Sequence, residues 1–339
     1  MLTTIVVPTV DAGDMLLRAL EYVDADSPDI ELVIVDNGST DDSVERTVAR
    51  FPHAHVIRNE SNAGFAPACN RGAEYAHGKY ILFLNNDAFL SASDLKALVD
   101  AAQGDRPGAV WQPVNYNADG AVDSAGDLFN RTGIFVHETD IPAEEVHAIF
   151  ATKGPALLVR TNEFRSLGGF HDDYFAYFEE SDLCWRARMQ GFEVRVVTTA
   201  RVAHIGGQTT ARILSPEDIR YLAFRNRFRT ILSNASASTL AVMVPLHLLA
   251  CLGFVASYVV TRRPRSAASV VKALWWAVGN HDVWRRQRAS VQADRRLADR
   301  DVLRRDLRAS FTPAVLWRHA RRHIFLWEKA AGTAGGDQR

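Results

Sequence analysis

One stretch constrains the fold more than any other: residues 80–87, which read YILFLNND. An apolar run, Ile81 to Leu84, ends abruptly in two amides and a carboxylate. Continuous apolar strands are typical of parallel sheets covered on both faces, and such sheets bind ligands outside the carboxyl ends of their strands. Asp87 is then placed as a hard oxygen ligand for a divalent cation. The alternative is that Asp87 only caps the next helix, where Asp is also favoured.

Short apolar or β-branched segments alternate with helical patterns along the first two thirds of the chain. This alternation indicates β-α-β units and an α/β, doubly wound, Rossmann-like sheet. Residues 113–150 show no such pattern, and we expect loops and short strands there that cover the site. The predicted strands are 3–7, 31–36, 55–58, 79–84, 109–113, 156–160 and 192–197, and the predicted helices include 65–76, 91–103, 183–190 and 216–232.

The first strands end in polar residues that would meet at one edge of the sheet. Pro8-Thr9, Asp36 and Asn85–Asp87 follow their strands directly. The chain has no G-x-G-x-x-G after its first strand and no G-x-x-x-x-G-K-[ST], which argues against a dinucleotide or P-loop site. The edge instead predicts a site for a nucleotide or a metal-bound phosphate.

A second polar cluster lies in residues 171–182, where acids stand beside aromatic residues. A carboxylate partly removed from water has a raised pKa and is a better base near neutral pH. Glu180 and Asp182 are candidates for that role. Glu179 is better explained by the start of a helix, where negative charge is favourable. His204, taken alone, is better explained as a structural histidine.

Seven motifs in order resemble the inverting glycosyltransferases of family 2, which have the GT-A fold with a mixed sheet, close to rhamnosyl- and galactofuranosyltransferases. The resemblance covers Thr3 to about Leu232. The motifs are IVVPT at 5–9, VDNGSTDDS at 35–43, NAGFAPACNRG at 62–72, LNND at 84–87, GPALLVR at 154–160, GGFHDDYFAYFEESDLCWR at 168–186 and VAHIGG at 202–207.

The resemblance implies a role for each matching residue. Two strand ends would bind the nucleobase and the ribose of a nucleotide, and the loop after Glu60 would pack beside that nucleotide. The LNND motif would bind a cation on the diphosphate. The resemblance also implies one general base and an acceptor side. The residues are Thr9 and Asp36 for the nucleotide, Asn62 and Gly64 for its flank, Asn86 and Asp87 for the metal motif, His204 as a further metal ligand, Glu180 as the base, and Gly154 and Pro155 for the acceptor side.

The chain departs from the family pattern at several of these positions. The base is usually Asp, whereas Glu180 stands here, which leaves Asp182 as the alternative base. Asn85 and Asn86 leave Asp87 as the single acid of the metal motif, and His171 replaces an Asp. The first strand ends in Pro-Thr where relatives often carry Asn-Tyr. The implied cofactor is Mg²⁺ or Mn²⁺, and the implied donor is TDP-rhamnose or a UDP-sugar. The rival interpretation is a non-catalytic sugar-nucleotide-binding scaffold.

The C-terminal third differs in character from the rest. No Asp, Glu, Lys or Arg occurs between Arg229 and Arg262. Residues 239–260 are long enough to cross a hydrocarbon core, although Pro245 and His247 weaken that interpretation. Positive charge on both flanks gives no orientation. We therefore expect an interfacial helix or a hairpin in preference to a single crossing, with a soluble dimerisation helix as the alternative.

Charge supports the membrane surface as a partner. Residues 262–339 hold 18 of the 39 Lys and Arg but only 7 of the 40 Asp and Glu. Tryptophans beside arginines at 275–286 and again at 317–327 are typical of interfacial helices, whereas residues 287–307 read as a charged, solvated helix. No nucleic-acid reader fold is recognisable. Three scattered cysteines and the absence of a signal peptide indicate the reducing, cytoplasmic side of the cell membrane.

These patterns divide the chain into three parts. The predicted domains are a GT-A catalytic domain at 1–232, a helical, membrane-interfacial region at 233–329 and a disordered tail at 330–339. The expected reaction transfers a sugar to a saccharide or lipid-linked acceptor in the synthesis of a cell-surface polysaccharide.

Overall fold

The computed structural model describes residues 2–104, 108–206 and 213–303. Contacts within the chain divide it into two compact units. The sheet unit comprises residues 1–127 and 137–206, and the helical unit comprises 128–136 and 207–339. The predicted boundary at residue 232 stays a prediction.

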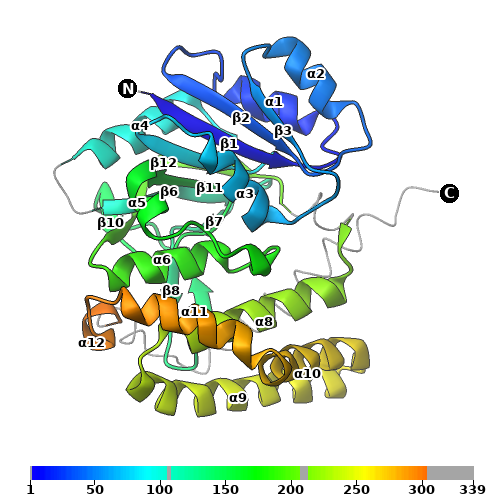
Figure 1. The fold of residues 1–339 in the computed structure, drawn as a ribbon, viewed down its shortest axis with the longest axis vertical. Coiled ribbons are helices and arrows are strands. Elements are labelled where there is room, and N and C mark those ends of the chain that lie inside the picture. Colours follow the sequence, from blue (N-terminus) through cyan, green and yellow to red (C-terminus); the bar gives the residue numbers. More distant parts are fainter. Residues whose placement is uncertain (1, 105–107, 207–212, 304–339) are drawn as a thin grey trace. The chain divides into compact units, whose positions relative to one another are not determined.

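Parallel strands form one half of the main sheet (Figure 1). The strand β1 (Thr3–Thr9) lies between β2 (Ile30–Asp36) and β4 (Tyr80–Leu84), and β3 (His55–Arg58) pairs with β2. Every residue of β4 is buried, as the apolar run predicts. Because these strands run in one direction, their carboxyl ends meet at one edge.

The other half makes the sheet mixed. The strand β11 (Ala156–Arg160) is antiparallel to both β4 and β6 (Gly108–Asn117), and β6 is parallel to β12 (Glu193–His204). The order across the sheet is β10-β12-β6-β11-β4-β1-β2-β3. This arrangement confirms the predicted mixed α/β sheet. The short strands are β5 (Ala88–Leu90), β7 (Val122–Ser124), β8 (Asp127–Phe129), β9 (Phe135–His137) and β10 (Val146–Ala148).

Helices cover both faces of this sheet. On one face, Leu16, Leu20, Val44 and Leu98 belong to one apolar cluster with alternate residues of β1, β2 and β4. On the other face, Phe83 of β4 packs against aromatic rings at 164 and 170. The helices of the sheet unit are α1 (Met15–Tyr22), α2 (Ser43–Arg50), α3 (Phe65–Glu74), α4 (Ala92–Gln103), α5 (Thr161–Ser166), the 3₁₀ turn η1 (Asp172–Tyr174) and α6 (Glu179–Met189).

Two differences from the predicted elements bear on the site. The helix α6 begins at Glu179, not at Leu183, so the acidic residues form its first turn. The strand β12 continues to His204 because it pairs with both β6 and β5 along its length. Both differences carry candidate residues onto regular elements.

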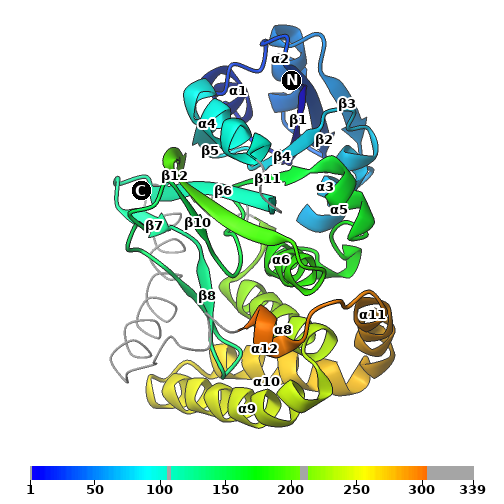
Figure 2. The ribbon, with the colours of Figure 1, turned by 90° about the vertical axis from the view of Figure 1, so that its left-hand side faces the viewer.

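In the described part of the helical unit, four longer helices and one short helix are present, and they are labelled in Figure 2. They are α8 (Pro216–Asn234), α9 (Ala237–Val260), α10 (Pro264–Gly279), α11 (His281–Ala293) and α12 (Asp299–Val302). Among the described residues, α9 is the one helix long and apolar enough to cross a membrane.

The predicted charged helix at 287–307 is wrong in its extent. The helix α11 ends at Ala293, and the chain is non-helical until Asp299. Arg295 and Asp299 still pair, at 2.6 Å, but across this break. The predicted pair of Asp301 with Arg305, the segment 317–327 and the tail 330–339 lie outside the described residues.

Candidate active site

Thr9, Asp36 and Asn86 lie at the carboxyl edge of the parallel strands. All three are buried, and Asn86 Nδ2 donates a hydrogen bond to Thr9 Oγ1 at 3.0 Å. Asp36 Oδ1 accepts from the backbone N–H of Ser39 at 2.8 Å, and Asp36 Oδ2 accepts from Arg58 Nη1 at 2.9 Å. The strand ends therefore assemble a fixed polar edge, whose amide and carboxylate groups suit a nucleoside.

The loop at Asn62 and Gly64 is tied to the same edge. Asn62 Oδ1 accepts from the N–H of Gly64 at 2.9 Å, and the carbonyl of Gly64 accepts from Asn37 Nδ2 at 3.1 Å. Gly64 has φ +100°, and a Cβ there would lie 2.5 Å from the carbonyl oxygen of Phe175. Glycine is required here for both its backbone conformation and its close approach to the 175–178 segment.

Asp87 and His204 meet through strand pairing. His204 lies opposite Ala88 in the β5–β12 ladder, and its Nε2 lies 3.1 Å from Asp87 Oδ1. Two such groups fit a Mg²⁺ or Mn²⁺ that takes its other ligands from diphosphate and water. Among the described residues, no group of three or more His, Cys, Asp or Glu side chains forms a metal centre. The protein alone thus offers a partial ligand set.

Glu180 lies in the first turn of α6, half-buried as a residue but with its Oε2 atom buried. Its Oε2 has no hydrogen-bond partner among the described residues, while the N–H of Gly154 hydrogen-bonds to its carboxylate. Burial raises the pKa of Glu180 from 4.5 to about 7, and the negative charge of Asp127 adds to the rise. A carboxyl group with this pKa is half ionised at neutral pH and suits general base catalysis.

The backbone before Glu180 is strained. Phe175, Tyr177 and Phe178 have φ values of +63°, +72° and +72°. Side chains other than glycine rarely adopt this region, and such strain clusters at functional sites. Here the strained segment leads directly into α6 and contacts the loop at Gly64 through Phe175, whose carbonyl oxygen accepts a hydrogen bond from the N–H of Phe65.

The neighbouring acids differ from Glu180 in their surroundings. Asp182 Oδ2 accepts from Arg186 Nε at 2.7 Å, and Asp182 Oδ1 accepts from the Tyr174 hydroxyl at 3.3 Å. Arg186 in turn donates to the carbonyl oxygens of Leu167 and Gly169. Asp182 therefore anchors the loop before α6. Burial, reinforced by the charge of Glu180, raises the pKa of the Glu179 carboxyl well above its usual value.

Gly154 and Pro155 lie between Glu180 and the strand end at Asn85. The carbonyl of Pro155 accepts from the N–H of Asn85 at 2.9 Å. A Cβ at Gly154 would lie 3.3 Å from Glu180 Oε1, a distance that requires the neighbour to shift. This segment therefore contacts both Glu180 and the strand end at Asn85.

The sequence patterns missed two ion pairs near Glu180. His137 Nδ1 lies 2.5 Å from Asp127 Oδ1, and Lys153 pairs with Asp123. Asp127 exchanges backbone hydrogen bonds with Ala151, three residues before Gly154. Asp123, Asp127 and His137 come from the stretch 113–150, which has no periodic pattern from which these pairs could be predicted. The pairing of β8 with β9, the strands that carry Asp127 and His137, is not predictable from the local sequence.

Together these residues place the carboxyl group of Glu180, the polar strand edge at Thr9, Asp36 and Asn86, and the pair of Asp87 with His204 in one unit. Comparison with known proteins gives the same picture. The sequence profile described as Glycosyl transferase family 2 matches residues 4–181, more than half of the chain. The N-acetylglucosaminyl-diphospho-decaprenol L-rhamnosyltransferase of Mycobacterium tuberculosis is 27% identical over 240 residues, which cover 61% of this chain and 77% of that protein.

Solved structures share the fold at low sequence identity. S. aureus TarS 1–349 in complex with UDP-GlcNAc has a TM-score of 0.55 and 17% identity, covering 87% of this chain and 93% of that chain. The mannosyltransferase PcManGT from Pyrobaculum calidifontis, in complex with GDP-Man and Mn²⁺, has a TM-score of 0.54 and 16% identity, covering 98% and 87%. The chain is a glycosyltransferase that belongs to glycosyl transferase family 2, and its sheet has the GT-A fold.

Proposed function

We propose that the protein is an inverting, metal-dependent hexosyltransferase. Its donor is a nucleotide-diphosphate sugar, TDP-rhamnose or a UDP-sugar, and its acceptor is a hydroxyl of a saccharide or lipid-linked saccharide in cell-surface polysaccharide synthesis. One observation carries the proposal: Glu180 presents a buried carboxylate oxygen that has no hydrogen-bond partner in the described part of the chain, and burial raises its pKa to about 7. The decaprenol-linked relative supports the acceptor class.

Glu180 acts as the general base in this mechanism. Its unpartnered oxygen accepts the proton of the acceptor hydroxyl as that oxygen attacks the anomeric carbon. The bond from the anomeric carbon to the diphosphate breaks on the opposite face, so the configuration inverts. The nucleotide diphosphate leaves with the bonding electron pair. A positioned base of this kind contributes about 10²–10⁴-fold to the rate.

The remaining site residues bind and orient the donor. Thr9, Asp36, Asn62 and Gly64 hold the nucleoside, and Asn86 fixes Thr9 through its amide. Asp87 and His204 would hold the divalent cation, which when bound neutralises negative charge on the diphosphate. Gly154 and Pro155 shape the acceptor side beside the base.

We infer that Glu180, not Asp182, is the base. Both oxygens of Asp182 bind side chains, and its nearest cation, Arg186, is also buried. Both carboxylate oxygens of Asp182 are therefore already engaged with side chains that hold the loop before α6.

The rival function is a scaffold that binds sugar nucleotides without turnover, which the single acid in the metal motif favours. Purified protein with UDP- and TDP-sugars and Mn²⁺ separates the two, with release of nucleotide diphosphate as the readout. The enzyme should release nucleotide diphosphate from one donor class, and Glu180→Gln should bind that donor equally but release almost none. Saturable donor binding without release from the unaltered protein would establish the scaffold.

We place the reaction at the cytoplasmic side of the cell membrane. The described cysteines are all free and buried, as expected of a reducing compartment. The apolar helix α9, with little of its surface buried, supports membrane association.

A further inference from the structure

The helix α9 presents a continuous apolar stripe to solvent. Its 24 residues contain no Asp, Glu, Lys or Arg. Leu249 is 66% exposed, Leu252 is 61% exposed and Val260 is 81% exposed. The exposed apolar residues recur every three or four positions along one face of the helix, so they form one continuous apolar surface instead of isolated exposed side chains. They are Ala241, Val242, Pro245, Leu248, Leu249, Leu252, Gly253, Ala256, Val259 and Val260.

The opposite face of α9 is built into the helical unit. His247 Nδ1 lies 2.8 Å from the carbonyl oxygen of Thr132, and burial lowers the pKa of His247 to about 3, so its ring is neutral. Near the other end, the hydroxyl of Tyr258 accepts from Arg220 Nε at 3.1 Å. Cys251 between them packs in an apolar cluster shared with α8 and α10. These contacts fasten both halves of the helix to the same unit.

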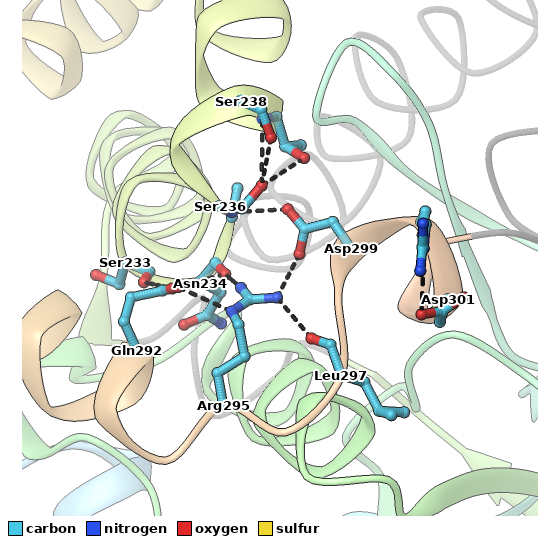
Figure 3. A network of polar contacts seen from close by, with 12 residues as sticks. Ser233, Asn234, Ser236, Ser238, Gln292, Arg295, Leu297, Asp299 and Asp301 are labelled. Atoms are coloured by element: carbon cyan, nitrogen blue, oxygen red, sulfur yellow. Dashed lines mark hydrogen bonds and ion pairs between the residues drawn. The ribbon is translucent and has the colours of Figure 1, made fainter.

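The N-terminus of α9 sits in a polar network (Figure 3). Ser236 caps the helix by accepting from the N–H of Thr239 at 3.3 Å, and its own N–H donates to Asp299 Oδ2 at 2.7 Å. Arg295 bridges Asp299 and the carbonyl of Asn234. Such a network requires water or protein around it, so this end of α9 is not in hydrocarbon.

The helix α10 lies beside α9 in both views (Figures 1 and 2) and supplies the groups that membrane headgroups attract. Trp275 is 68% exposed and Val278 is 63% exposed. Lys272 on α10 and Arg262 and Arg265 at the α9–α10 turn are also exposed. Tryptophan at the headgroup level and cations against anionic lipid are the marks of an interfacial surface.

We propose that α9 lies in the plane of one leaflet, with its apolar stripe inserted among the acyl chains. The basic residues of α10 and of the turn between α9 and α10 would then lie against anionic headgroups. Length does not distinguish this from a crossing, since 24 residues reach about 36 Å. The fixed partners of α9 do distinguish the two, because a crossing would pull His247 and Tyr258 away from their hydrogen bonds to Thr132 and Arg220. The inference sharpens the membrane location given under the proposed function.

Binding is tested with the full chain and sucrose-loaded vesicles of phosphatidylcholine, with and without phosphatidylglycerol. The protein should sediment with the vesicles, more strongly with the anionic lipid. The variant Leu249→Glu/Leu252→Glu should lose about tenfold or more of the bound fraction. Tyr22→Glu on α1, where Tyr22 is 54% exposed, is the matched control and should bind normally. Circular dichroism melts confirm that each variant is folded.

Orientation is tested by cysteine labelling, because the three native cysteines are buried. Ser238→Cys and Thr261→Cys lie at exposed positions near the two ends of α9. An impermeant maleimide added outside the vesicles should label both ends of the bound protein. Protection of one end would mean a crossing and would overturn the inference.

Two further outcomes would also overturn it. Absence of vesicle binding by the unaltered protein would do so. So would a dimer in solution that the Leu249→Glu/Leu252→Glu substitution separates, because the stripe would then be the interface with a second copy. No donor or acceptor is present in these measurements, so they stand independently of whether the proposed transfer reaction is correct.

Discussion

Replacing Glu180 by Gln should remove activity and at the same time stabilise the fold. The amide keeps the shape of the side chain and can still accept from the N–H of Gly154, but it cannot take a proton. Turnover should fall by about 10²–10⁴-fold. In the unaltered enzyme, kcat should follow ionisation of Glu180, with a midpoint near pH 7 and a tenfold fall per pH unit below it.

The stabilisation follows from the same raised pKa. Because burial makes the folded-state pKa about 7 and the ordinary value is 4.5, the folded protein holds this proton more tightly than the unfolded chain. Stability therefore falls as the pH rises from 4.5 through 7 and then levels. One pKa unit corresponds to about 1.4 kcal/mol, so the ionised carboxylate costs the fold about 3 kcal/mol at pH 8. Glu180→Gln should recover that amount at pH 8 and almost nothing at pH 4.

Urea denaturation at pH 4 and pH 8 checks the predicted gain in stability. The value of kcat, measured from nucleotide diphosphate release, checks the predicted loss of turnover. Glu179→Gln is the matched control, since Glu179 is the neighbouring acid in the same helical turn, is buried and also has a raised pKa. It should gain stability at pH 8 while retaining transfer. Near-normal turnover in Glu180→Gln would move the base elsewhere, first to Asp182. Loss of stability at pH 8 would refute the assigned burial of the charge.

Three further substitutions test the neighbouring groups. Burial raises the pKa of Glu180 and the charge of His137 lowers it. His137→Gln should therefore shift the acid limb of the kcat profile to higher pH, and an unchanged acid limb would show that His137 does not influence the pKa of Glu180. Asp182→Asn leaves Arg186 buried without its carboxylate and should destabilise the fold by about 3 kcal/mol or more, as seen by urea denaturation; an inactive but fully stable variant would instead make Asp182 the base. Asp87→Ala should raise the Mn²⁺ concentration for half-maximal transfer by about tenfold or more, and an unchanged metal dependence would remove Asp87 from the cation site.

Much of the fold was predictable because the buried strands carry a strong local signal. The strands at 55–58 and 156–160 have the predicted bounds, and the apolar run at 80–84 is buried throughout. The extension of β12 to His204 was missed because Thr198, Thr199 and Arg201 interrupt the apolar pattern. Pairing with β6 and β5 keeps that polar stretch in the sheet, a tertiary effect that local sequence does not encode.

The site was predictable where chemistry follows directly from a strand end. Thr9 and Asn86 were both named from sequence, and the hydrogen bond between them follows from parallel neighbours. The pair of His137 with Asp127 could not be foreseen, since it depends on the short β8–β9 pairing within an irregular stretch. The choice between Glu180 and Asp182 also needed structure, because only the position of Arg186 shows which acid is already paired.

The most direct test of the central claim is the anomeric configuration of the product. With the donor identified by nucleotide diphosphate release, proton NMR of the purified product reports the new glycosidic bond. Direct displacement with Glu180 as the base predicts a configuration opposite to that of the donor. Retention of the donor configuration would contradict the account.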